Sequence, residues 1–171
     1  MAHNSQNLLY LLRSLNTTKS TNFASEQVIA FFLAQEGAEI AQRARDDLIL
    51  ENLENSSNGG WDEFVDESGT FQNCYDGCGL ELNTDGTGSL RTPVNCDAIE
   101  NCRMNFSSGN GRAEYTYQNI GDESPYTRVI TFENVSSDEV RIQSQVYWRS
   151  GSQRDVQQVE VVTYLFNVYD R

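Results

Sequence analysis

Histidine and long apolar runs are almost absent from this sequence. The single histidine, His3, stands at the start of the chain, so catalytic triads and metal sites built on histidine are excluded from the rest. No nucleophile-elbow, phosphate-binding or dinucleotide-binding motif occurs. We therefore expect a protein that is not an enzyme and that needs no cofactor and no metal. No run of 18 apolar residues occurs either, so no segment of the given sequence is expected to span a bilayer.

Basic residues are scarce as well. The 171 residues include 12 Lys and Arg against 25 Asp and Glu, which gives a formal net charge of −13. Most of the excess falls in residues 51–111, which carry 11 acidic and 2 basic side chains. A nucleic-acid-binding surface must neutralise phosphates with Lys and Arg. Nucleic acid is therefore disfavoured as a partner.

Four cysteines lie close together in the acidic middle of the chain: Cys74, Cys78, Cys96 and Cys102. An even number within a Gly-, Asn- and Asp-rich stretch predicts two disulfides formed in an oxidising compartment. A structural zinc site is the alternative, although zinc sites usually show a tighter C-x2-C spacing. We expect disulfides, and we also expect an extracellular location.

The N-terminal segment, residues 1–53, is predicted to be helical. From Ser25, a suitable N-cap, to Leu53, apolar residues recur at three- and four-residue steps. The residues of this predicted buried face are Val28, Phe32, Ala38, Ala41, Ala44 and Leu48. A second apolar patch precedes it, and the polar run 16–21 is expected to separate the two. This patch, a candidate assembly interface, consists of Leu8, Leu9, Leu11, Leu12 and Leu15.

Residues 54–111 are predicted to form an acidic loop region that contains one hairpin. Strand-like residues on each side of the turn-like segment 83–88 place the centre of the hairpin near residue 87. Residues equally distant from that centre would face each other, so a nested pairing, Cys78–Cys96 inside Cys74–Cys102, is favoured. Two local pairings, 74–78 and 96–102, remain open. The segment 83–88 also resembles half of a calcium loop, but a turn is the preferred interpretation.

Residues 112–171 are predicted to form antiparallel strands. Between Val140 and Trp148 apolar and polar residues alternate almost without exception. The last strand, within 156–169, is apolar on both sides and is therefore expected to be central or covered on both faces. A helix followed by strands predicts one α+β domain in which a long N-terminal helix packs on a C-terminal antiparallel sheet.

The helical segment contains a family motif. Residues 29–40 include Leu33, Ala34, Gln35, Glu36 and Gly37, and an Arg-rich helix end follows. With Gly60-Trp61-Asp62-Glu63-Phe64 further along the chain, this segment resembles bacterial type IV pilin-like proteins, the minor pilins and pseudopilins of the prepilin type. In that family the motif lies in a long helix that carries an antiparallel sheet.

The resemblance implies a subunit of a type IV pilus-like surface filament that acts by assembly, priming, capping or adhesion. Its partners would be other pilin or pseudopilin subunits, the inner membrane before assembly and, for adhesion, a host or cell surface. The family's leader and membrane helix are not in the given sequence, so we expect them upstream of Met1. The alternative hypothesis is an extracellular binding module whose acidic, disulfide-tied loop recognises a cation, a glycan or a host protein.

Overall fold

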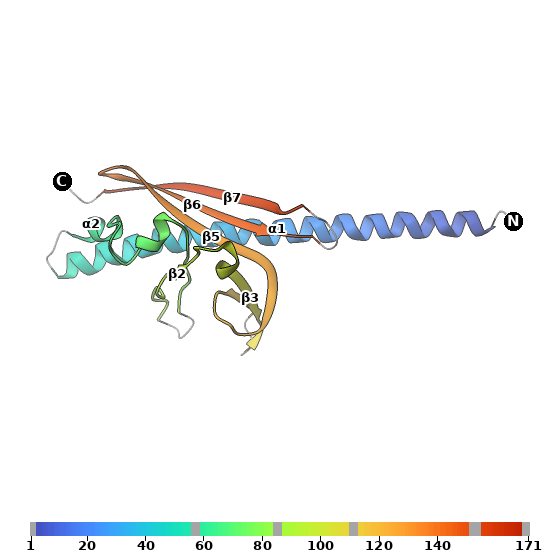
Figure 1. The fold of residues 1–171 in the computed structure, drawn as a ribbon, viewed down its shortest axis with the longest axis horizontal. Coiled ribbons are helices and arrows are strands. Elements are labelled where there is room, and N and C mark those ends of the chain that lie inside the picture. Colours follow the sequence, from blue (N-terminus) through green and yellow to red (C-terminus); the bar gives the residue numbers. More distant parts are fainter. Residues whose placement is uncertain (1–2, 56–58, 84–86, 110–112, 151–154, 169–171) are drawn as a thin grey trace.

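The computed structural model describes residues 3–55, 59–83, 87–109, 113–150 and 155–168, with side chains described from Thr21 onward. A single long helix, α1 (His3–Glu54), begins the chain. Figure 1 shows its N-terminal part extending well beyond the strands, while its C-terminal part lies along them. No helix in the described part of the chain combines the length and the apolar character needed to cross a membrane.

The helix is continuous where the sequence predicts a break. The polar run 16–21 lies inside α1, and Ser25 is an interior residue and not an N-cap. Asn, Ser and Thr lower helix stability only slightly, whereas Gly and Pro, which disfavour helices most, do not occur in that run. The side chains of Leu8, Leu9, Leu11, Leu12 and Leu15 lie outside the described residues.

Within the described residues, seven strands form one antiparallel sheet around the long strand β5 (Asp122–Ser136). One edge of β5 pairs with β6 (Glu139–Trp148), which pairs in turn with β7 (Gln157–Phe166). The other strands lie on the opposite edge of β5: β1 (Cys78–Gly79), β2 (Val94–Asn95), β3 (Arg103–Ser107) and β4 (Glu114–Thr116). Two short helices, α2 (Gly60–Phe64) and η1 (Gln72–Tyr75), lie between α1 and β1, and η2 (Ile99–Cys102) lies between β2 and β3. The fold is therefore α+β, as the sequence predicts.

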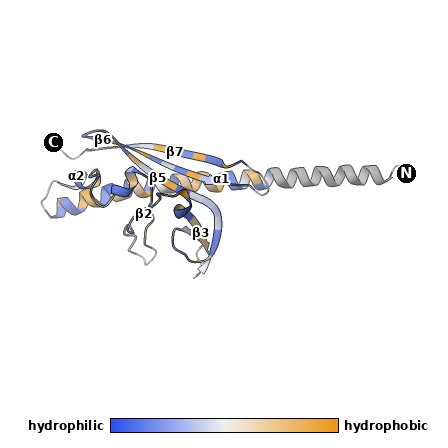
Figure 2. Cartoon of the chain, in the orientation of Figure 1, coloured by the Kyte–Doolittle hydropathy of each residue, from blue (hydrophilic) through white to orange (hydrophobic). Residues whose placement is uncertain are grey.

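The alternation along β6 is confirmed by burial. Every second residue of β6 is buried, and this row consists of Val140, Ile142, Ser144, Val146 and Trp148. The row faces α1, whose contacts with the sheet are made mainly with β6 and β7. Hydrophobic and hydrophilic positions alternate along β7 and along the coloured, C-terminal part of α1 in Figure 2.

The face that α1 buries differs in part from the predicted one. Ala38, Ala41 and Ala44 are buried as expected, but Val28 and Phe32 are 54% and 61% exposed. The rest of the buried face is made of Ala30, Leu33, Ala34, Gly37, Ile40 and Ile49. Small side chains let the helix axis approach the sheet, so the large side chains lie on its flanks.

Close packing of the helix on the sheet is most demanding at Gly37. A Cβ atom at this position would overlap the hydroxyl of Ser144 and would lie 3.1 Å from both Arg128 Cδ and Ile130 Cδ1. The glycine therefore serves contact with β5 and β6. Helix α2 completes the core from the other end, because Trp61 is 4% exposed and its Nε1 donates a hydrogen bond to the carbonyl of Ser137 (2.7 Å).

The disulfides are local, so the nested pairing favoured from the sequence is wrong. Cys74 is bonded to Cys78, and Cys96 is bonded to Cys102. The predicted hairpin exists, but Cys78 stands opposite Asn95, one position from Cys96. Because neighbouring residues of a strand point to opposite faces, this offset directs the two cysteines away from each other.

A glycine explains why the first local loop can close. Gly77 has a φ of 125°, which L-residues with side chains rarely adopt, and it turns the chain from η1 into β1. This turn brings the Cα atoms of Cys74 and Cys78 to 4.5 Å, within the range of a disulfide.

The last strand is an edge strand, which corrects a further expectation. Among the described residues β7 pairs only with β6. Its outward side chains Val162, Tyr164 and Phe166 are 38–48% exposed, so the apolar character of both faces does not reflect cover on both faces.

We predict that Gly37→Ala lowers the free energy of unfolding by about 1–2 kcal/mol, because overpacking outweighs the gain of about 1 kcal/mol in helix propensity. Ser144→Ala removes the overlapping hydroxyl, so the same substitution costs less in that background. Urea unfolding of the unaltered protein, the two single variants and the double variant measures how much Gly37→Ala costs with and without the Ser144 hydroxyl. Gly59→Ala is the control, since its Cβ would meet only Asn52 Oδ1, at 3.7 Å. Equal losses with and without Ser144 would contradict the packing argument.

A tryptic digest without reduction should separate the two disulfides. Trypsin cleaves after Arg45, Arg91 and Arg103, which yields the fragments 46–91 and 92–103. With local pairing each fragment keeps its own disulfide and has its own mass. A single linked species that splits only after reduction would instead establish the nested pairing.

Candidate functional site

A buried arginine joins the helix, the hairpin and the sheet. Arg128 of β5 is 1% exposed, and its guanidinium donates in three directions. Nη1 donates to the carboxylate of Glu36 (2.7 Å) and to the carbonyl of Leu33 (3.1 Å), both on α1. Nη2 donates to the carbonyl of Leu80 (2.8 Å), and Nε donates to the hydroxyl of Tyr117 (2.9 Å). One side chain thus fixes three segments that are far apart in the sequence.

The electrostatics of this group favour the charged arginine. Burial by itself lowers the pKa of Arg128, but Tyr117 and Glu36 outweigh that effect and hold the pKa above its ordinary value. Burial also raises the pKa of the Tyr117 hydroxyl, which donates a hydrogen bond to the carbonyl of Arg128 (3.0 Å). The guanidinium carbon lies 5.2 Å from the centre of the Tyr117 ring, within the range of a cation–π contact.

The segment Leu33–Gly37 of α1 lies against this arginine. Leu33 offers its carbonyl, Glu36 offers its carboxylate, and Gly37 provides the space for the Arg128 side chain. Ala34 is fully buried, while Gln35 is exposed and donates to the carboxylate of Glu39 on the next turn (2.9 Å). Trp61 is not part of this group and anchors α2 to the core instead.

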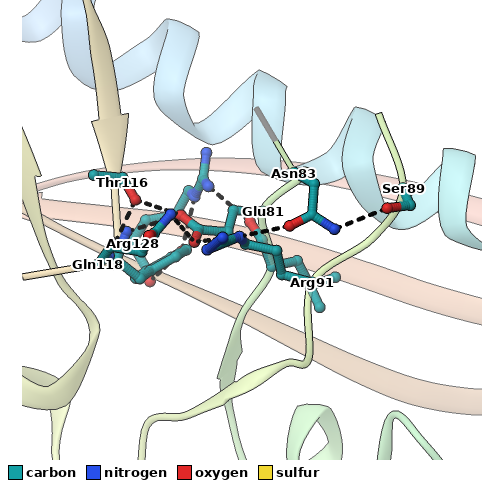
Figure 3. Close-up of polar contacts among 9 residues, drawn as sticks. Glu81, Asn83, Ser89, Arg91, Thr116, Gln118 and Arg128 are labelled. Carbon is teal, nitrogen blue, oxygen red and sulfur yellow. Dashed lines mark hydrogen bonds and ion pairs between the residues drawn. The ribbon is translucent and has the colours of Figure 1, made fainter. Parts of the chain in front are cut away.

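A second polar group lies beside Arg128 and is centred on Glu81. Its carboxylate accepts hydrogen bonds from the hydroxyl of Thr116 (2.8 Å) and the backbone N–H of Tyr117 (2.9 Å). Arg91 Nε lies 3.6 Å from the same carboxylate and donates to the side-chain oxygen of Asn83 (2.9 Å). Figure 3 shows Glu81, Thr116, Arg91 and Asn83 lying together, with α1 running past them. The hairpin is thereby joined to the segment after β4.

Between these segments lies a groove of about 920 Å³. One wall is α1 from Ile29 to Arg43, and the other walls are the hairpin and the segment 113–118. Arg128 and Leu33 are among the lining residues. A volume of this size is typical of ligand sites in proteins.

The turn-like segment 83–88 is only partly described. Asn83 and Ser89 pair across the hairpin, with the N–H of Asn83 donating to the carbonyl of Ser89 (2.7 Å), which agrees with a turn; residues 84–86 lie outside the described residues. The Asn83 side-chain oxygen, a calcium ligand in the alternative interpretation, accepts from Arg91. Among the residues that the structure describes, no three His, Cys, Asp or Glu side chains are grouped to hold a metal ion.

The sequence did not reveal the residues at the centre of this site. Arg128, Tyr117 and Glu81 belong to no motif. A signal was nevertheless present, because Arg128 occupies the same alternate positions as the buried residues Tyr126, Ile130 and Phe132. A charged residue in a buried row requires a partner from another element.

Comparisons with protein-family models, with curated proteins and with solved structures found no match for this chain. The function must therefore be argued from the fold and from the site.

We predict that Arg128→Met lowers the free energy of unfolding by about 3–5 kcal/mol, because buried acceptors from three segments each lose a hydrogen bond. Glu36→Gln should cost less than about 1 kcal/mol, since the Glu36 side chain is 53% exposed and water replaces its partner. Chemical denaturation of both variants tests whether Arg128→Met costs more free energy of unfolding than Glu36→Gln. Similar losses in the free energy of unfolding would show that Arg128 stabilises the fold through its ion pair with Glu36, and not through its hydrogen bonds to buried carbonyls.

Proposed function

We propose that this chain is a minor pilin-like subunit of a type IV pilus-like surface filament. The observation that carries the proposal is the division of α1 into two parts. The C-terminal part is buried against the sheet from Ala30 onward, whereas the N-terminal part extends past the strands (Figure 1). A helix that extends from its own domain is suited to packing against other helices.

Two further features support the proposal. The segment from Leu33 to Gly37, by which the sequence resembles pilin-like proteins, packs against the sheet at Gly37 and accepts a hydrogen bond from Arg128 at Leu33. The two disulfides suit a protein exposed to an oxidising compartment, as an extracellular filament is. In this proposal the partners are other pilin-like subunits and, before assembly, the inner membrane, and the role is assembly and not catalysis.

The test uses the complete gene in a filament-producing bacterium. We expect the protein in the membrane fraction when filament assembly is disabled and in sheared surface filaments when it is intact. Leu8→Glu with Leu12→Glu should reduce the filament-bound amount by about tenfold or more, because charge would be buried between helices. The purified variant should keep its unfolding midpoint.

Leu50→Glu is the matched control, since Leu50 is a leucine of the same helix that is 58% exposed at the sheet-covered end. It should enter filaments normally. Absence of the unaltered protein from both the membrane and the filaments would refute the proposal, and so would equal incorporation of the Leu8/Leu12 variant.

A further inference from the structure

The groove beside Arg128 exposes apolar side chains that nothing in the described structure covers. Phe32 is 61% exposed on the α1 wall, next to Ile29, and Leu82 and Tyr115 contribute from the other walls. Phe31, which is 46% exposed, makes an edge-to-face contact with Phe32 and extends the apolar surface around the helix, beyond the groove itself. Contiguous exposed apolar side chains mark interaction sites more often than single ones do.

The groove is also acidic. Four glutamates and two arginines line it, and both arginines already have carboxylate partners: Arg128 is paired with Glu36 and Arg43 with Asp47 (3.5 Å). Glu39 and Glu114 stand on different elements and have no cationic partner among the described residues. Within the described part of the chain, the groove therefore presents uncompensated negative charge beside apolar surface.

These properties decide between the possible occupants. A nucleic acid or a second copy of this chain, which carries a net charge of −13, would bring negative charge to negative charge. A segment with both basic and apolar side chains complements the two features of the groove together. A volume of about 920 Å³, open along a helix, suits such a segment better than a single ion.

We propose that this groove binds a basic, amphipathic segment of a partner protein, with apolar side chains against Phe32 and Tyr115 and Lys or Arg side chains at Glu39 and Glu114. This site is separate from the helix surface used in the proposed filament. Binding is expected to weaken as salt rises, because the two carboxylates lie at the surface.

The probe is a short fluorescein-labelled peptide of alternating lysine and leucine, measured by fluorescence anisotropy with the whole chain. Glu39→Gln with Glu114→Gln should weaken binding about tenfold, and Phe32→Ser by a similar factor. The control for charge is Glu51→Gln with Glu54→Gln, two exposed carboxylates elsewhere on α1. The control for exposed apolar surface is Val135→Ser, at a residue 49% exposed on β5. Both controls should bind as the unaltered protein does.

Three results would overturn the proposal. The first is a loss in the Glu51/Glu54 control as large as in the groove variants, which would show unspecific attraction to an acidic protein. The second is equal binding of a glutamate–leucine peptide. The third is no binding of the basic peptide, with or without binding of a neutral oligosaccharide. Unfolding midpoints of all variants distinguish loss of binding from loss of structure, and none of these outcomes depends on filament assembly.

Discussion

The hydrogen bonding of Arg128 is the constraint on which the arrangement of this protein depends. A guanidinium that is 1% exposed must find its acceptors within the protein, and here they come from α1, from the hairpin and from the segment after β4. Each acceptor is a backbone carbonyl or a group held by other contacts, so the positions of these segments are fixed relative to one another. The hairpin is thereby held beside the helix, and the groove lies between them.

The small residues of α1 have a second consequence. Gly37 and the alanines let the helix lie close to β5 and β6, and this close approach is what allows the carbonyl of Leu33 to reach Arg128. Since the buried face is made mainly of small side chains, the large ones, such as Phe31 and Phe32, lie on the flanks of the helix. The same packing that stabilises the domain therefore produces the apolar wall of the groove.

Local patterns in the sequence predicted much of this fold. The alternation along β6, the hairpin and the α+β class were predicted from apolar spacing and turn residues, and the structure bears them out. The disulfide pairing did not follow, because a one-residue difference in register reverses the face on which Cys96 lies. The set of groups around Arg128 could not be predicted from a motif either. Arg128 donates to the backbone carbonyls of Leu33 and Leu80, which residues of any type could supply, and to the hydroxyl of Tyr117. The carbonyls come from segments far from Arg128 in the sequence, so no short motif contains them.

The division of α1 also bears on how its proposed roles can coexist. At a rise of about 1.5 Å per residue, residues 3–20 extend over about 27 Å, which is enough for several turns of contact with neighbouring helices. The groove lies along the later part of the helix, between Ile29 and Arg43, where the sheet and the hairpin hold it. Packing of the early turns against other subunits leaves that wall uncovered. A filament built through the first part of α1 could therefore still present the acidic groove to a partner.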